Sequence, residues 1–220
     1  MTCCLCLHEI AVAVYAGTES TNSTDWGECL PLWWSADGVA GRDVALAAMP
    51  VTAIDLDDLP TAELAPFAGL ILAGRSDQSL LAMMQDKLRG YLDKGRVVVF
   101  SGQLTHGWLL GATAFEPGPQ LGGEPGPPQL HDHPILSGVS PDDVGATFLY
   151  SNGRHRLPVG PDVIAQRADG TPGAYVDRTT TGGTVLLHGG AHLLANATTG
   201  SSAARIAPQL IDWVRREAHR

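Results

Sequence analysis

Side chains that could take part in chemistry gather directly after two apolar runs, residues 97–100 and 184–187. A serine hydroxyl becomes a nucleophile when an adjacent imidazole accepts its proton, and imidazoles near neutrality also donate protons or bind metals. The candidate catalytic residues are the serine and the two histidines that follow these runs, Ser101, His188 and His192. They predict hydroxyl or acid–base chemistry if the fold brings the two runs together.

The run 97–100 predicts the buried central strand of a sheet, because consecutive apolar residues without polar alternation are typical of a parallel strand covered on both faces. Residues 67–74 predict a second strand. Between them a helix is expected, with Asp77 as its N-cap and Gly95 as its stop. Its apolar residues recur at steps of four, at Leu80, Met84, Leu88 and Leu92. A strand, a helix and a strand imply a parallel crossover, and we expect residues 12–15 to flank the central strand on its other side.

Small molecules bind open parallel sheets in the crevice beyond the carboxyl ends of the strands. We therefore predict a small-molecule site at the strand ends 16–20, 74–77, 101–106 and 188–192. The further residues expected to contact the ligand are Gly74, Arg75, Ser76, Asp77, Gly102, Gln103 and His106. Two alternatives stay open: that the residues after the central strand only turn the chain, and that the histidines are core residues satisfied by backbone carbonyls.

The remaining elements complete an α/β domain. Apolar segments predict strands at 9–15, 51–54, 147–150, 163–167, 173–177 and 184–188, a helix at 39–49, and a last helix that ends near residue 218. The hairpin-type spacing of the last three strands suggests an antiparallel extension of the parallel sheet. The expected fold is therefore a doubly wound, mainly parallel α/β sheet in a single domain of residues 1–220, with residues 1–8 flexible.

Residues 116–130 hold five prolines and four glycines in fifteen residues. Such a segment cannot form a helix or an internal strand, so we expect it to run over the surface. Its place after the predicted site leaves three interpretations open: a lid, a contact loop or a loop without function.

Three other clusters carry residues that bind metals in other proteins. They are Cys3, Cys4 and Cys6, then Asp55, Asp57 and Asp58, and finally His131, Asp132 and His133. The cysteine spacing fits no zinc module, the aspartates suit a solvated loop with a helix cap, and alternating residues of extended chain point to opposite sides. No metal site and no cofactor is assigned.

The composition of the chain excludes some classes of binding partner. The chain has 220 residues and a formal net charge of −9, and its longest basic cluster is Arg215-Arg216. Nucleic-acid binding requires basic surface, so nucleic acid is not expected as a ligand. No apolar run approaches the length of a membrane span, and residues 1–16 lack the features of a signal peptide. We therefore expect a cytoplasmic protein without a membrane partner.

The order of these elements resembles a known family. Residues 67–107, with FAGLILAGRSD, a helix and YLDKGRVVVFSGQLTHG, look like the core of the class I glutamine amidotransferase-like superfamily, whose fold is flavodoxin-like. Residues 133–139 are similar to the HPI element of its ThuA-like branch, and segments 172–178, 182–188 and 190–192 resemble the closing strands of that branch. The resemblance implies a polar or carbohydrate-like small molecule as the ligand.

The chain also departs from that family. Amidotransferases carry a cysteine nucleophile at the strand-to-helix elbow, where this chain has Ser101, Gly102 and Gln103. His188 matches the catalytic histidine, but Gly189-Gly190 replaces the usual Pro-Glu, so the carboxylate that would orient the imidazole is missing. We therefore expect no glutaminase activity.

Two hypotheses follow. The first is an atypical enzyme with hydrolase-like or acid–base chemistry on a polar or carbohydrate-like molecule. The second is a noncatalytic binding or assembly subunit with a degenerate amidotransferase site. A homo-oligomer or a complex with a partner protein is compatible with both.

Overall fold

A computed structural model describes residues 9–14, 51–73, 76–118, 126–144, 148–150, 152–194 and 200–220. Several features predicted from the sequence lie outside these residues. They are the flexible N-terminus with Cys3, Cys4 and Cys6, the turn 16–20, the helix 39–49, Gly74, Arg75 and part of the loop 116–130.

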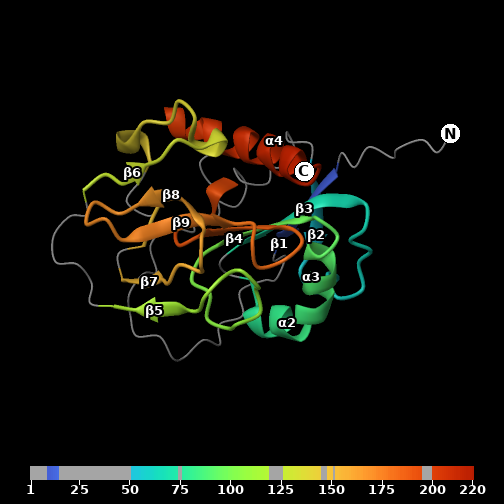
Figure 1. Cartoon of the computed structure of the whole chain (residues 1–220). Helices are drawn as coiled ribbons and strands as arrows, with labels where there is room; N and C mark the ends of the chain where they lie inside the picture. The colour runs from blue at the N-terminus through green and yellow to red at the C-terminus, as the bar shows by residue number, and fades with distance from the viewer. Residues whose placement is uncertain are drawn as a thin grey trace.

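The described residues form an α/β domain around a mixed eight-stranded sheet (Figure 1). Its strands, in spatial order, are β2 (Thr52–Asp55), β1 (Glu9–Val14), β3 (Phe67–Ala73), β4 (Val97–Ser101), β10 (Thr184–His188), β9 (Pro172–Asp177), β8 (Asp162–Gln166) and β6 (Gln129–Leu130). Neighbours from β2 to β10 are parallel, and β9, β8 and β6 extend the sheet in antiparallel fashion. A separate antiparallel pair joins β5 (Phe115–Pro117) to β7 (Gly153–His155).

The central position of β4 is confirmed, but one of its predicted neighbours is wrong. β4 lies between β3 and β10, and residues 12–14 lie in β1 on the far side of β3. β10 was expected in the antiparallel extension, whereas it is parallel to β4, and the extension begins at β9. Both β1 and β10 are apolar runs, so composition alone does not decide which of them pairs with β4.

The predicted strand at 147–150 is also wrong for the residues that the structure describes there. Residues 148–150 form irregular chain, in which Phe148 and Leu149 are nonetheless buried. Their apolar side chains pack into the core without pairing in the sheet. We call residues 148–150 the covering segment, because they lie over the end of β10.

Helices cover both faces of the sheet (Figure 1): α2 (Gln78–Met83) and α3 (Gln85–Leu92) on one, α4 (Ile206–Glu217) on the other. The Asp77 carboxylate caps α2 by accepting hydrogen bonds from the N–H groups of Ser79 and Leu80. After α3 the chain turns at Gly95, whose φ of 77° favours glycine and whose N–H donates to Leu92 O. The predicted cap and stop are therefore confirmed, although the helix is interrupted at Met84.

Successive side chains of β4 point to opposite faces of the sheet and pack in two separate core clusters. Val97 and Val99 pack on the α4 side, while Val98 and Phe100 pack on the side of α2 and α3. Short 3₁₀ helices at Pro134–Leu136, Pro141–Asp143 and Ser202–Arg205 complete the α4 layer. No helix in the described part of the chain combines the length and apolar character that crossing a membrane requires.

Candidate functional site

Ser101 and His188 lie side by side at the carboxyl ends of two neighbouring parallel strands. The two residues are register partners between β4 and β10. Both belong to the alternate positions that face α4, because Val99 and Leu186, two residues earlier, pack in the core cluster on that side. The structure thus brings together the hydroxyl and the imidazole that the sequence singled out.

Neither side chain of this pair is satisfied or accessible. Ser101 is 0% exposed and His188 is 1% exposed. Among the residues that the structure describes, the Ser101 hydroxyl and both ring nitrogens of His188 have no hydrogen-bond partner, so the two residues do not bond to each other. An unpaired buried polar group costs about 1–3 kcal/mol, which makes this pair an unfavourable feature of the core.

The surroundings of His188 make it a weak base. Burial is the largest cause that lowers its pKa, to about 3, and the neighbouring His192 and His155 act in the same direction. Backbone groups of Phe148 and Ala191 favour the charged ring, but too weakly to offset burial. Relative to free imidazole, the ring is less basic by a factor of about a thousand. It is therefore neutral near pH 7 and poorly suited to accept the proton of a serine hydroxyl.

The covering segment closes the end of β10. The Tyr150 N–H donates to Gly189 O at 2.8 Å, and the Phe148 ring centroid lies 4.8 Å from that of the His188 imidazole. A Cβ atom on Gly190 would lie 1.7 Å from Phe148 O, far inside van der Waals contact. The covering segment therefore leaves no room for a side chain at residue 190.

The other predicted site residues serve the local structure. His192 is half-buried, and its Nδ1 accepts a hydrogen bond from the Leu194 N–H at 3.0 Å. Gln103 donates from Nε2 to Asn152 Oδ1 at 3.1 Å. His106 is exposed, and its Nδ1 lies 3.0 Å from Thr105 Oγ1. These contacts do not bring Gln103 or His106 to the Ser101–His188 pair.

Three further predicted residues lie around the strand ends. Gly102 turns the chain after β4 with a φ of 138°, and its N–H donates to His188 O at 2.8 Å. Ser76 is buried just before α2, and Asp77 is the N-cap of that helix.

Two buried polar residues near the strand ends, Gln78 and His155, were not predicted from the sequence. Gln78 holds the loop after β4, because its Nε2 donates to Gln103 O at 2.7 Å and its Oε1 accepts from Thr105 N–H at 2.8 Å and from Trp108 Nε1 at 3.2 Å. His155 lies between two carbonyls, with Nδ1 2.8 Å from Thr113 O and Nε2 3.2 Å from Gly102 O. Burial lowers the pKa of His155, although both carbonyls favour the charged ring. Isolated polar residues like these carry no sequence pattern that would reveal them.

The His131-Asp132-His133 cluster acts as a cap at one position. His133 Nδ1 accepts a long hydrogen bond, 3.4 Å, from the Ile135 N–H at the start of a 3₁₀ helix. Burial, followed by the charge of Arg178, lowers the pKa of His133 to about 4. In the part of the chain that the structure describes, no three His, Cys, Asp or Glu side chains are grouped closely enough to hold a metal ion.

A small recess lies beyond the covering segment, where the β5–β7 pair meets the end of the main sheet. It is lined by Phe115, Tyr150, Gly153, Arg154, His155, Arg167, Pro172, Gly173 and Gly189. It offers about 10 Å³ for the centre of a water molecule. A volume of this size accommodates one water molecule.

Comparison with known proteins supports the fold alone. No protein-family model matches the chain, and neither does any curated protein. An exo-β-1,4-mannosidase, Op5Man5 from Opitutaceae bacterium strain TAV5, is 14% identical with a TM-score of 0.50, over 96% of this chain and 34% of that chain. This chain therefore spans about a third of the mannosidase.

Two further solved structures are similar over nearly the whole chain. The mmIFT52 N-terminal domain is 9% identical with a TM-score of 0.51, over 94% of this chain and 97% of that chain. A glutamine amidotransferase from Methylobacillus flagellatus is 17% identical over 96% of this chain and 91% of that chain, but its TM-score is 0.40, too low to carry an argument. What these likenesses establish is an α/β fold with a mostly parallel sheet.

Proposed function

We propose that this chain is a noncatalytic binding or assembly domain similar to class I glutamine amidotransferases of the ThuA-like branch, in which the former reaction centre has become part of the core. The order β2-β1-β3-β4-β10 of the parallel strands corresponds to the 2-1-3-4-5 order of flavodoxin-like folds, which supports the family comparison. The observation that carries the proposal is the position of the covering segment on Gly190 and His188.

The chemistry of the buried pair supports the same conclusion. A serine nucleophile needs a base within hydrogen-bond reach and a third group that orients the base. Here Ser101 and His188 form no hydrogen bond, and neither His188 nitrogen has a partner in the described structure. A base works best when its pKa is near the working pH, and that of His188 is about 3.

One observation favours the rival proposal of an enzyme acting on a polar or carbohydrate-like small molecule. Unsatisfied buried polar groups are rare and often mark a functional site, and Ser101 and His188 are register partners. Catalysis would require the covering segment to lift, which breaks the Tyr150–Gly189 hydrogen bond and exposes Phe148.

Turnover assays distinguish the noncatalytic proposal from the enzyme proposal. The full chain is incubated with glutamine, with p-nitrophenyl acetate and with p-nitrophenyl glycosides, and compared with Ser101→Ala and His188→Gln. Ser79→Ala is the matched control, because Ser79 is exposed on α2. We expect no turnover above the variants. Reproducible turnover overturns the proposal: its loss in Ser101→Ala and His188→Gln would assign it to the buried pair, and its survival would place it elsewhere.

A further inference from the structure

His155 is a buried titratable residue at the junction between the β5–β7 pair and the end of β4. Its side chain is 5% exposed. Nδ1 lies 2.8 Å from Thr113 O, and Nε2 lies 3.2 Å from Gly102 O. The imidazole packs edge-on against Phe115, with the ring centroids 5.2 Å apart. Both ring nitrogens of His155 therefore face groups that can only accept a hydrogen bond.

The number of hydrogen bonds that His155 can make depends on the charge of its ring. A neutral imidazole has one N–H donor and one bare nitrogen, whereas the imidazolium has two donors. The contact with Thr113 O is the shorter one, which assigns the proton of the neutral ring to Nδ1. Nε2 then directs its lone pair at Gly102 O, and these two acceptors repel each other. From this geometry we propose that His155 is a proton-dependent clamp, whose second bond, from Nε2–H to Gly102 O, forms when the ring takes up a proton.

The second bond of this clamp connects the small β5–β7 pair to the main sheet. His155 belongs to β7, and Thr113 comes just before β5. Gly102 follows β4 directly, and its N–H donates to His188 O at the end of β10, at 2.8 Å. A proton on Nε2 therefore links β7 to the carboxyl ends of both β4 and β10.

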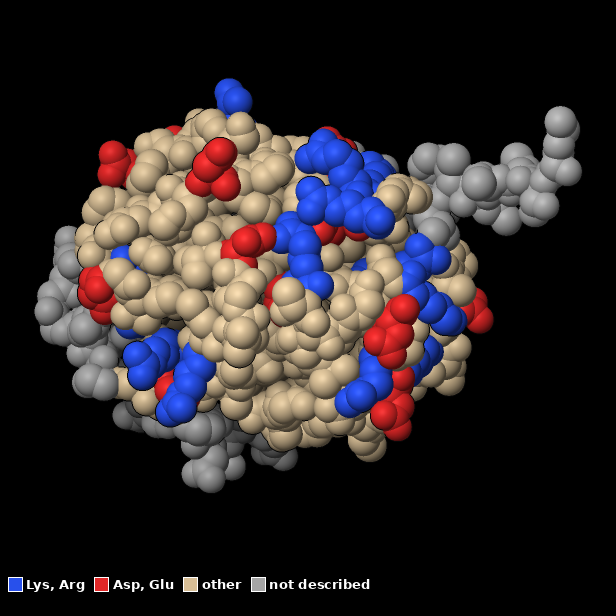
Figure 2. Space-filling model, viewed as in Figure 1, with Lys and Arg blue, Asp and Glu red and all other residues tan. Residues whose placement is uncertain are grey.

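The charged groups around His155 leave the two carbonyls as the partners of a charged ring. Because side chains alternate along β7, the exposed Arg154 and Arg156 lie on the other face of this strand, with Glu116 of β5. Side chains of both signs lie together over β5 and β7 in Figure 2. The titratable or cationic groups on the side of the imidazole are Tyr150 and Arg167, which line the recess with it, and His188. No carboxylate is among the described residues that line this recess.

The ring of His155 takes up its proton at acidic pH. Burial lowers the pKa of His155, although the bonds to Thr113 and Gly102 favour the charged ring. The ring is therefore neutral above the ordinary histidine pKa of about 6.5. Because the folded-state pKa is the lower one, the neutral ring stabilises the fold above that pH. This contribution is lost as the pH falls through the folded-state pKa, and the second bond offsets part of the loss.

This inference goes beyond the proposed function, because it concerns His155 and holds whether or not the buried pair is catalytic. The test is an NMR titration of the full chain from about pH 8 to about pH 4, which observes the ring nitrogens of His155 and the carbonyl carbon of Gly102. We expect a proton on Nδ1 alone at the upper end of this range and protons on both nitrogens at the lower end. The Gly102 carbonyl resonance should shift with the same midpoint. His188, with a pKa of about 3, titrates below this range.

Two variants assign the Gly102 shift to His155. His155→Gln keeps one N–H donor group for Thr113 O but has no titrating charge. His106→Gln is the matched control, because His106 is exposed in the chain that follows β4. We expect the pH-dependent shift of the Gly102 carbonyl to be lost in His155→Gln and kept in His106→Gln.

Four results would overturn the inference. Three of them are seen in the unmutated chain, so they decide the question even if His155→Gln does not fold. They are a neutral ring with its proton on Nε2, a ring that keeps one charge state over the whole pH range, and a Gly102 carbonyl that does not follow the ring. The fourth is a Gly102 shift that persists in a folded His155→Gln variant.

Discussion

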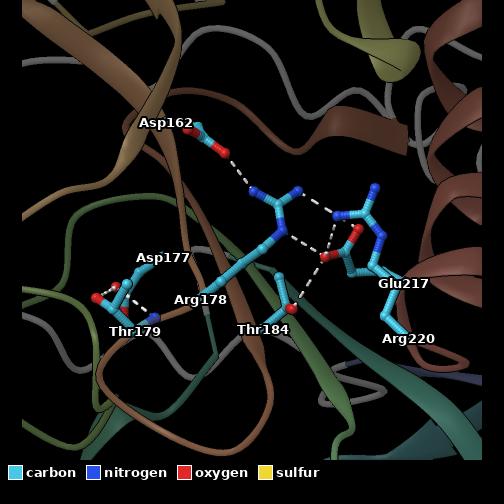
Figure 3. Close-up of polar contacts among 7 residues, drawn as sticks. All are labelled: Asp162, Asp177, Arg178, Thr179, Thr184, Glu217 and Arg220. Atoms are coloured by element: carbon cyan, nitrogen blue, oxygen red, sulfur yellow. Dashed lines mark hydrogen bonds and ion pairs between the residues drawn. The ribbon is translucent and has the colours of Figure 1, made fainter.

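Glu217→Gln should destabilise the domain, because Glu217 holds the end of α4 against the sheet through a nearly buried ion pair (Figure 3). The Glu217 side chain is 2% exposed and Arg178 is 26% exposed. Arg178 donates from Nε to Glu217 Oε1 and from Nη2 to Oε2, the latter at 3.4 Å. Thr184 Oγ1 and Arg220 Nη1 also contact Oε1, at 3.3 and 3.4 Å.

The size of the destabilisation depends on which contacts a glutamine at residue 217 retains. Removing one partner of a buried pair typically costs 3–5 kcal/mol, roughly, because the other charge is left unpaired. Glutamine retains an acceptor oxygen, Arg178 is partly hydrated, and Arg178 keeps its ion pair with Asp162. We therefore expect a loss of about 2 kcal/mol, which corresponds to a fall of roughly 4–8 °C in Tm for a domain of this size.

Thermal and urea unfolding measure this loss. The matched control is Asp212→Asn, which removes an exposed carboxylate on the same helix, paired with Arg215 at 3.7 Å, and should leave Tm unchanged. A double-mutant cycle with Arg178→Met should give a coupling of at least about 1 kcal/mol between residues 178 and 217. If Glu217→Gln behaves like Asp212→Asn, or the coupling is near zero, the network does not anchor α4 and the reasoning is refuted.

Three other predictions concern the closed site. His188 has a folded-state pKa of about 3, below its unfolded value, so its contribution to stability is present above about pH 7 and is lost as pH falls. Between pH 7 and pH 5 the loss in free energy of unfolding is about 2 kcal/mol. Urea unfolding should therefore show that the free energy of unfolding of His188→Gln depends less on pH than that of the unmutated chain. An equal pH dependence in the two proteins would contradict the burial argument. Gly190→Ala should cost about 3 kcal/mol through its clash with Phe148 O, whereas Gly90→Ala, with nothing within 4 Å, should be neutral or stabilising. Equal effects of the two alanines would mean that the covering segment moves aside freely. Ser101→Ala should raise the free energy of unfolding by about 1 kcal/mol, because it removes an unpaired buried hydroxyl; a lower value would reveal a hidden hydrogen bond.

Local patterns predicted the elements that depend on neighbours in sequence. The apolar run of β4, the Asp77 cap and the Gly95 stop are properties of a few consecutive residues, and the structure confirms each of them. Pairing depends instead on segments far apart in the chain. β10 reaches β4 only after a long excursion from residue 102 to residue 183, and nothing in the composition of β1 distinguishes it from β10 as a neighbour.

The covering segment shows a second limit of sequence patterns. Phe148 and Leu149 have the apolar character of a strand, but their backbone is irregular and their side chains fill the core beside β10. Periodicity reports burial, and burial does not require pairing in a sheet. The sequence singled out Ser101 and His188, which are register partners between β4 and β10, but it did not reveal that both are covered.

Gly189 and Gly190 explain how the covering segment fits over the end of β10. Read as sequence, these two glycines show only that no carboxylate follows His188 directly. In the structure, the lack of a side chain at residue 190 admits Phe148 O, and Gly189 O receives the Tyr150 N–H. The two glycines thus admit the segment that buries the serine and the histidine. The covering segment also forms one wall of the recess beside Gly189. The binding or assembly role that we propose therefore needs no chemistry from the buried pair.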